Sequence, residues 1–132
     1  MYTPGPGDKI IIADDKEHQR ELVKEMIETI FEPFPIEFYN DGNGLKSRLE
    51  RGVKDVKCII TDNDMINGPT GSQLILQYAG ENGIPPIVLI YGANDSNLIG
   101  EQAVKDGAVG YLKKPYTMSQ FKEVVRLVLG YR

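Results

Sequence analysis

The sequence has few features that would set the chain apart from an ordinary globular domain. Its single cysteine, Cys58, lies within an apolar run, so no disulfide can form inside one chain. A lone buried cysteine is usually inert packing, and the lack of a disulfide framework predicts a reducing, cytoplasmic location. No apolar run approaches the roughly 18 residues of a membrane span. The Pro- and Gly-rich start, residues 1–8, lacks the apolar core of a signal peptide and is predicted to be a flexible tail.

Excess positive charge is also missing. The chain carries 15 Lys and Arg against 19 Asp and Glu, a formal net charge of −4. This balance argues against a nucleic-acid surface, because contacts to phosphates need clustered basic side chains. With 132 residues, 41% hydrophobic and 26% charged, the chain is expected to form one domain, residues 9–132, with a real core.

Strand and helix patterns alternate five times along the chain. Short apolar runs predict strands over residues 9–13, 36–39, 56–60, 87–91 and 109–112. Apolar residues at helical spacing predict helices over residues 16–31, 45–51, 71–82, 96–105 and 117–129. Such alternation with short connections predicts an α/β fold, with a five-stranded parallel sheet covered by helices on both faces.

Charged and polar residues follow the strands where each one ends. They are Asp14 and Asp15 after the first strand, Asp62 and Asp64 after the third, Tyr91 and Gly92 after the fourth, and Lys113 and Lys114 after the fifth. The carboxyl ends of parallel strands share one edge of the sheet, where open α/β folds bind their ligands. Clustered carboxylates repel one another unless a cation offsets them, and oxygen ligands suit Mg²⁺. A lysine across the site suits phosphoryl oxygens, so the pattern predicts phosphoryl transfer.

Several motifs, taken in order, resemble those of the receiver domains of two-component response regulators, over about residues 9–129. The matching segments are 14–15, 40–42 (Asn-Asp-Gly), 62–65 (Asp-Asn-Asp-Met) and 107–115 (Gly-Ala-Val-Gly-Tyr-Leu-Lys-Lys-Pro). Each segment is weak evidence alone, but all of them at this spacing are specific. The resemblance implies a flavodoxin-like (βα)5 fold with the doubly wound strand order 2-1-3-4-5.

The resemblance also implies a role for each residue of the site. Asp62 would accept the phosphoryl group, and Asp15 and Asp62 would hold Mg²⁺ (or Mn²⁺) together with the backbone carbonyl of Asp64. Asp14 would orient metal-bound water. Lys114 would contact the phosphoryl oxygens and would pair with Asp62 beforehand. The side chain of Asp64 is expected to be a solvated loop acid rather than a ligand.

Two further residues near the fifth strand take roles from the resemblance. The bond between Lys114 and Pro115 would be cis, which a bond before proline can adopt at modest cost. Tyr111 would be the aromatic switch residue, although ordinary strand packing explains such a tyrosine equally well.

The chain departs from the family pattern at the end of the fourth strand. The family has Thr or Ser there, whose hydroxyl binds the phosphoryl group and draws the aromatic switch inward, whereas this chain has Tyr91. A phenol oxygen lies too far out on its rigid ring to replace that hydroxyl. Two arrangements are open: Tyr91 lies over the site as a lid, or it fills the space that Tyr111 would use. Coupling of the site to Tyr111 is therefore open.

A second departure follows Met65. The family usually has Pro next, whereas this chain has Ile66, and one extra residue separates Asp62 from Gly71. We expect a longer and less rigid loop. The additional carboxylate of Asp64 near the nucleophile could change the lifetime of an acyl phosphate in either direction.

The resemblance implies a signalling domain, not an enzyme with a separate substrate, which promotes its own phosphorylation and dephosphorylation. Its partners would be a histidine kinase or phosphotransfer protein, and a downstream target or fused output domain. The face made by residues 96–105, 109–112 and 117–129 could form a homodimer. Neither nucleic acid nor a membrane is an expected partner. Whether the chain stands alone or is the receiver of a larger protein is open.

Two other functions compete with a phosphorylation switch. Tyr91 and Ile66 suggest a degenerate receiver that binds partners without phosphorylation, whereas the retained Asp14, Asp62 and Lys114 favour the switch. Residues 59–64 also resemble the nucleophile motif of haloacid-dehalogenase-type phosphatases, with Asp64 as general acid. That family carries the motif on its first strand and in a longer chain, so this hypothesis is the weakest.

Overall fold

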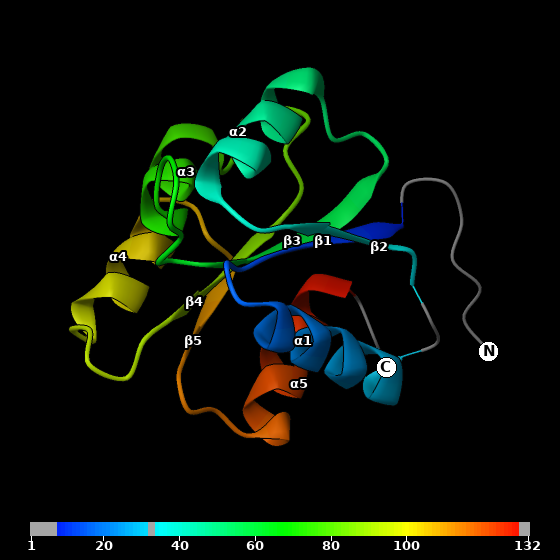
Figure 1. Cartoon of the computed structure of the whole chain (residues 1–132), viewed down its shortest axis with the longest axis vertical. Coiled ribbons are helices and arrows are strands. Elements are labelled where there is room, and N and C mark those ends of the chain that lie inside the picture. The colour runs from blue at the N-terminus through cyan, green and yellow to red at the C-terminus, as the bar shows by residue number, and fades with distance from the viewer. Residues whose placement is uncertain (1–7, 32–33, 130–132) are drawn as a thin grey trace.

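The structure is a computed structural model, and it describes residues 8–31 and 34–129. Most of the predicted tail lies outside this range. Five parallel strands form one sheet in the order β2-β1-β3-β4-β5 (Figure 1). The strands are β1 (Lys9–Ala13), β2 (Ile36–Tyr39), β3 (Val56–Asp62), β4 (Ile87–Tyr91) and β5 (Gly110–Lys113). The helices are α1 (Glu17–Ile30), α2 (Gly42–Arg51), α3 (Gly71–Tyr78), α4 (Leu98–Lys105) and α5 (Met118–Leu129). The predicted fold class and strand order are confirmed.

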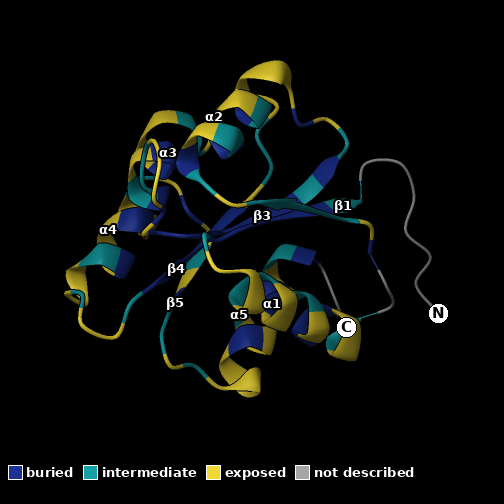
Figure 2. Ribbon diagram, viewed as in Figure 1, coloured by how far each residue is buried: buried dark blue, intermediate teal, exposed yellow. Residues whose placement is uncertain are grey.

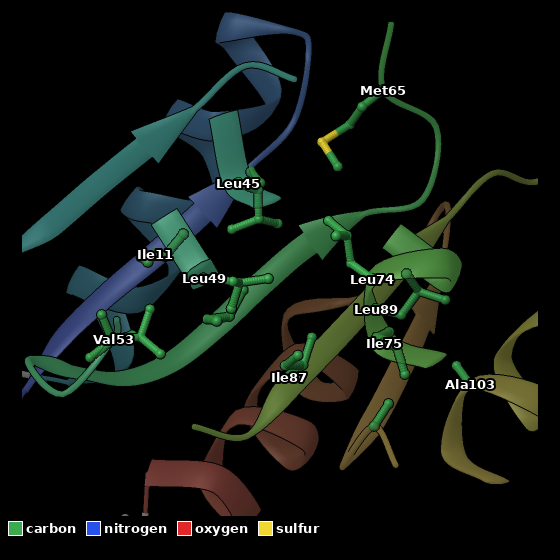
Figure 3. Close-up of a cluster of buried hydrophobic side chains, with 14 of the residues drawn as sticks. Ile11, Leu45, Leu49, Val53, Met65, Leu74, Ile75, Ile87, Leu89 and Ala103 are labelled. Atoms are coloured by element: carbon green, nitrogen blue, oxygen red, sulfur yellow. The ribbon is translucent and has the colours of Figure 1, made fainter. Parts of the chain in front are cut away.

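Helices cover both faces of the sheet. Figure 1 shows α1 and α5 on one face and α2, α3 and α4 on the other. Buried residues are concentrated in the strands and on the sheet-facing sides of the helices (Figure 2). Two apolar cores result, and Figure 3 shows labelled side chains of the core beneath α2, α3 and α4.

Alternation along β3 divides its side chains between these cores. Ile59 joins the core beneath α2 and α3, whereas Cys58 and Ile60 join the core beneath α1 and α5. Side chains on successive strand residues point to opposite faces, so a strand in the middle of this sheet must be apolar on both. Burial raises the pKa of the Cys58 thiol to about 12, which keeps it protonated and supports the inert interpretation.

Two helix boundaries differ from the sequence prediction by three residues or more. α2 begins at Gly42, three residues earlier than expected, because the Asp41 carboxylate accepts a hydrogen bond from the Gly44 N–H (2.7 Å) and caps the helix. α3 ends at Tyr78, four residues earlier than expected. Gly80 has φ +82, a left-handed conformation that stops the helix before Gly83, the glycine expected to end it.

The remaining predicted ends agree closely with the structure. The Thr117 Oγ1 accepts a hydrogen bond from the Gln120 N–H (3.0 Å), as expected for the residue that caps α5. β3 extends to Asp62, so the acidic residue closes the strand itself. No helix in the described part of the chain is both long and apolar enough to cross a bilayer.

Candidate functional site

The topology brings the predicted site residues to one edge of the sheet. Asp14 directly follows β1, Asp62 ends β3, and Lys114 directly follows β5. Because the strands are parallel and in close register, with Ala13 beside Thr61, these residues emerge at the carboxyl edge together. Three distant parts of the chain thus meet at one site, as the sequence predicted.

Three carboxylates lie within reach of a single ion. Asp14, Asp15 and Asp62 each offer an oxygen, and these oxygens lie within 4.8 Å of one another. Asp14 and Asp62 are each only 5% exposed, whereas Asp15 is half-buried. An all-oxygen, partly open set of this kind fits a hard divalent cation that keeps some of its water. The exposed Asp64 is not part of this cluster.

Burial and mutual repulsion shift the acidity of the cluster. Burial, aided by the charge of Asp14, raises the pKa of the Asp62 carboxyl to about 6, against the opposing effect of Lys114. Burial likewise raises the pKa of Asp14. The protein holds these two carboxylates in a place where the charged form is disfavoured unless a cation is close. A bound cation would offset the negative charge of these carboxylates, so the set of oxygen ligands fits a cation.

Lys114 places a positively charged side chain beside the acidic cluster. Its Nζ lies 3.0 Å from Asp62 Oδ1 and 3.8 Å from Asp14 Oδ2. The backbone holds this lysine in place, because its N–H donates to the Tyr91 carbonyl (2.9 Å). The predicted cis bond between Lys114 and Pro115 is present. The neighbouring Lys113 instead reaches Asn97 Oδ1 (2.6 Å) at the surface.

The connection from β3 to α3 is anchored at its start by Asn63, for which the sequence pattern predicted no role. The side-chain oxygen of Asn63 accepts hydrogen bonds from the Ser72 N–H (2.8 Å) and the Ser72 hydroxyl (2.6 Å). The Asn63 carbonyl also accepts from the Gly71 N–H (3.1 Å). These bonds hold α3 against the carboxyl end of β3. In the sequence, the only indication of this role is that the amide residue Asn63 directly follows the acidic end of β3.

The far end of the same connection packs against the start of α2. The Asn43 N–H donates to the Asn67 carbonyl (3.0 Å). Gly68, with φ +92, and Gly42 let the two backbones approach: a Cβ on Gly42 would collide with the Pro69 carbonyl. The loop is one residue longer than the family pattern, yet both of its ends are tied to neighbouring helices.

Tyr91 points into the core and not over the site. Its side chain is 1% exposed and belongs to the core beneath α3 and α4. Its ring centroid lies 6.0 Å from that of Tyr111, which is 37% exposed. The structure therefore contradicts the lid arrangement and favours the alternative, in which Tyr91 occupies interior space beside Tyr111.

Tyr116 is a rim residue whose surroundings the sequence did not reveal. Its ring stacks on that of Phe121, with centroids 6.2 Å apart. Burial, with the charges of Asp14 and Asp62, raises the pKa of its hydroxyl to about 12. Tyr116 is thus a neutral neighbour of the site.

The fold and site geometry agree with the comparison to known families. The family model "Response regulator receiver domain" matches residues 10–126. The chain belongs to this family. The site described above is therefore the acidic site of a receiver domain, a signalling domain of two-component systems.

Solved structures of receiver domains share the fold. A response regulator receiver domain from Clostridium thermocellum superposes with a TM-score of 0.75 at 20% identity, covering 92% of this chain and 94% of its own. A receiver protein from Burkholderia phymatum gives 0.74 at 24% identity, with 94% and 96% covered. The beryllofluoride-activated NtrC4 receiver domain dimer gives 0.75 at 16% identity, with 92% and 96% covered. No curated protein matches the chain.

Proposed function

We propose that this receiver domain accepts a phosphoryl group on Asp62 from a histidine kinase or phosphotransfer protein and thereby changes its contacts with other proteins. The observation that carries the proposal is the pairing of the buried Asp62 carboxylate with Lys114, beside Asp14 and Asp15. A phosphoryl acceptor needs a carboxylate oxygen free to attack and nearby positive charge for the transferred group.

The proposed transfer forms a bond between phosphorus and Asp62 and breaks the bond between phosphorus and the donor. A carboxylate oxygen of Asp62 attacks phosphorus as the bond from phosphorus to the donor's imidazole nitrogen breaks, and the imidazole leaves with the electron pair. The product is a mixed anhydride of phosphate and the Asp62 carboxyl. Lys114, freed from its ion pair with Asp62, then faces phosphoryl oxygens, where its charge offsets theirs. Attack of water on the phosphorus returns the carboxylate and inorganic phosphate.

The acidic cluster also supports a magnesium site. Asp15, Asp62 and the backbone carbonyl of Asp64 would hold Mg²⁺ (or Mn²⁺), and Asp14 would orient a water of its shell. When bound, the ion offsets negative charge on the transferring group. Asp14 is held for such a role, since its Oδ1 accepts a hydrogen bond from the Lys16 N–H (3.0 Å).

A homodimer through α4, β5 and α5 is part of the proposal. It is supported by the neighbouring NtrC4 receiver domain, whose structure is a dimer. Exposed apolar side chains on this part of the chain, among them Leu98, Val104 and Leu127, are compatible with a protein contact. A fused output domain or a separate downstream protein would be the other user of this face.

Intact-mass measurement after incubation with acetyl phosphate and Mg²⁺ tests the proposal. We expect wild type and Asp64→Asn to gain one phosphoryl group, and Asp62→Asn to gain none. Asp64→Asn is the matched control, because it removes an exposed acid two residues from the acceptor. Failure of wild type to gain mass or bind Mg²⁺ would contradict the proposal.

That negative result would favour the second candidate, a receiver that binds partners without phosphorylation. The specific observation behind this candidate is the buried Tyr91 at the position of the family's hydroxyl residue. Turnover of a phosphate ester that Asp64→Asn abolishes would instead point to a phosphatase, although the family match over residues 10–126 favours a receiver.

A further inference from the structure

The buried side chain of Tyr91 lies beneath the first turn of α4. The N-cap residue of α4, Asn97, makes no side-chain capping bond. The first free N–H groups of the helix are instead bonded by Ser96, whose Oγ accepts from the Leu98 N–H and whose carbonyl accepts from the Ile99 N–H (3.1 Å each). The next residue is the buried Gly100, whose N–H lies near the Tyr91 phenol and partly opposes the rise that burial causes in the pKa of that hydroxyl. A side chain of β4 thus reaches the first turn of α4 from the core side.

Gly100 has a second contact that depends on the absence of a side chain. A Cβ at this position would collide with the ring of Tyr111, so the ring lies directly against the helix backbone. Tyr111 in turn lies 6.0 Å, centroid to centroid, from Tyr91. Gly100 is therefore enclosed between the phenol oxygen of one tyrosine and the ring of the other. This contact joins β4, α4 and β5.

The volume of Tyr91 limits where Tyr111 can go. The Tyr91 ring is fully buried in the core beneath α3 and α4, and protein cores are close-packed. An inward movement of Tyr111 would have to displace this ring, which lies 6.0 Å away, centroid to centroid. Tyr111 accordingly remains partly exposed at the surface.

We propose that Tyr91 is a positioning residue that holds α4 and Tyr111 in one arrangement, whether or not Asp62 carries a phosphoryl group. The proposal rests on the proposed function, because it describes how the same site is connected to the α4–β5 surface. It replaces the hydroxyl coupling that the family resemblance implies with a fixed contact. A contact through the α4–β5–α5 face would then not depend on phosphorylation, and the phosphorylation signal would leave the domain through another surface.

Amide hydrogen exchange of the unphosphorylated chain tests the role of Tyr91 directly. Tyr91→Phe keeps the ring and removes only the phenol oxygen beside the Gly100 N–H. We expect that N–H to exchange about three to ten times faster, since losing a polar partner at a buried N–H has an effect on this scale, with α5 amides unchanged. Tyr78→Phe is the matched control, because it removes a phenol hydroxyl bonded to Glu50 at the surface (3.0 Å). An unchanged exchange rate at Gly100 in Tyr91→Phe would overturn the proposal.

A second experiment tests independence from phosphorylation. Amide chemical shifts are compared with and without beryllofluoride and Mg²⁺. In wild type we expect changes near Asp62 and Lys114 but not at Gly100 or Tyr111. In Tyr91→Thr, which restores a small hydroxyl residue, Gly100 and Tyr111 should respond. If the Gly100 and Tyr111 amides respond as strongly in wild type as in Tyr91→Thr, the proposal is contradicted. Absence of any change near Asp62 would count against the proposed function, whereas the exchange experiment would still decide the role of Tyr91.

Discussion

At the scale of single residues, Lys114 has the clearest role, because it faces both buried carboxylates of the site. Its Nζ is 3.0 Å from Asp62 and 3.8 Å from Asp14. We expect Lys114→Ala to slow phosphoryl uptake from acetyl phosphate by about tenfold or more, since it removes a fixed positive charge where negative charge develops. The rate is measured from the intact mass over time at saturating Mg²⁺.

Lys113 is the matched control for this prediction. It is the preceding residue, carries the same charge, and binds Asn97 at the surface rather than the acidic site. The Lys113→Ala variant should be phosphorylated within about twofold of the wild-type rate, because it changes only the long-range charge around the site. Equal slowing in both variants would show that the general field, and not the ion pair, determines the rate.

At the scale of elements, the connection from β3 to α3 depends on its contact with the start of α2. We expect Gly42→Ala to lower the free energy of unfolding by about 1–3 kcal/mol, because its Cβ would collide with the Pro69 carbonyl and force the backbones apart. Gly44→Ala is the control in the same helix, since its Cβ would meet only side-chain atoms, of Tyr39 (3.1 Å) and of the capping Asp41 (3.2 Å), and no backbone.

Urea unfolding of both variants measures the difference. A loss of stability in Gly42→Ala no larger than in Gly44→Ala would mean that the loop moves freely away from α2. Because the loop starts directly after Asp62, the proposed acceptor, Gly42→Ala should also slow phosphorylation, whereas a loose loop would leave the rate unchanged.

Sequence patterns located the elements better than their ends. Strand positions followed from apolar runs, because a buried parallel sheet tolerates nothing else in the middle of its strands. The end of α3 was wrong, since either Gly80 or Gly83 could stop a helix and only tertiary packing selects the first. The carboxylates and Lys114 were predictable because parallel strands bring their carboxyl ends together.

The direction of Tyr91 was not predictable in the same way. A tyrosine that ends a strand can turn either to solvent or to the core, and strand periodicity does not decide at its last residue. The direction it takes depends on the space beneath α4, which arises only after the chain has folded. Asn63 was overlooked for a similar reason, since its partner Ser72 becomes visible only once α3 is placed.

At the scale of the whole molecule, a charged network ties the amino ends of the sheet to α2. The Arg48 guanidinium binds Glu37 (2.8 Å) and Asp55 (2.8 Å), and Lys9 binds the same two acids (3.2 Å each). Arg48→Met should lower the free energy of unfolding by about 1–3 kcal/mol, because the arginine side chain is only 12% exposed and its removal leaves Glu37 partly buried without its main partner.

Arg126→Met is the control for that prediction. Arg126 pairs with Glu123 along α5 at 3.9 Å, and both side chains are largely exposed. Such a surface pair contributes little, so the control should change stability by less than about 0.5 kcal/mol. A similar small effect in Arg48→Met would show that the network is as screened as an ordinary surface pair.

The same network predicts how stability depends on pH. Hydrogen bonds from Arg48, Tyr39 and Lys9 outweigh burial and lower the pKa of the Glu37 carboxyl from 4.5 to about 2. Between these values the unfolded chain binds more protons than the folded one, so this contribution is complete above pH 4.5 and is lost as the pH falls toward 2. The pKa of Asp55 is also lowered to about 2, chiefly by Arg48, but its greater exposure makes its share small.

Comparing wild type with Arg48→Met separates this effect from that of Asp62, whose pKa is shifted in the opposite direction. Asp62 has a raised pKa in the folded chain, so its contribution grows as the pH falls through about 6, and it is present in both proteins. We therefore expect the difference in free energy of unfolding between the two proteins to be largest near pH 6 and to shrink by about 1–2 kcal/mol by pH 3. Urea titrations at both pH values measure this difference. A gap that stays constant with pH would mean that Arg48 stabilises the fold by packing its side chain, and not by holding Glu37 ionised.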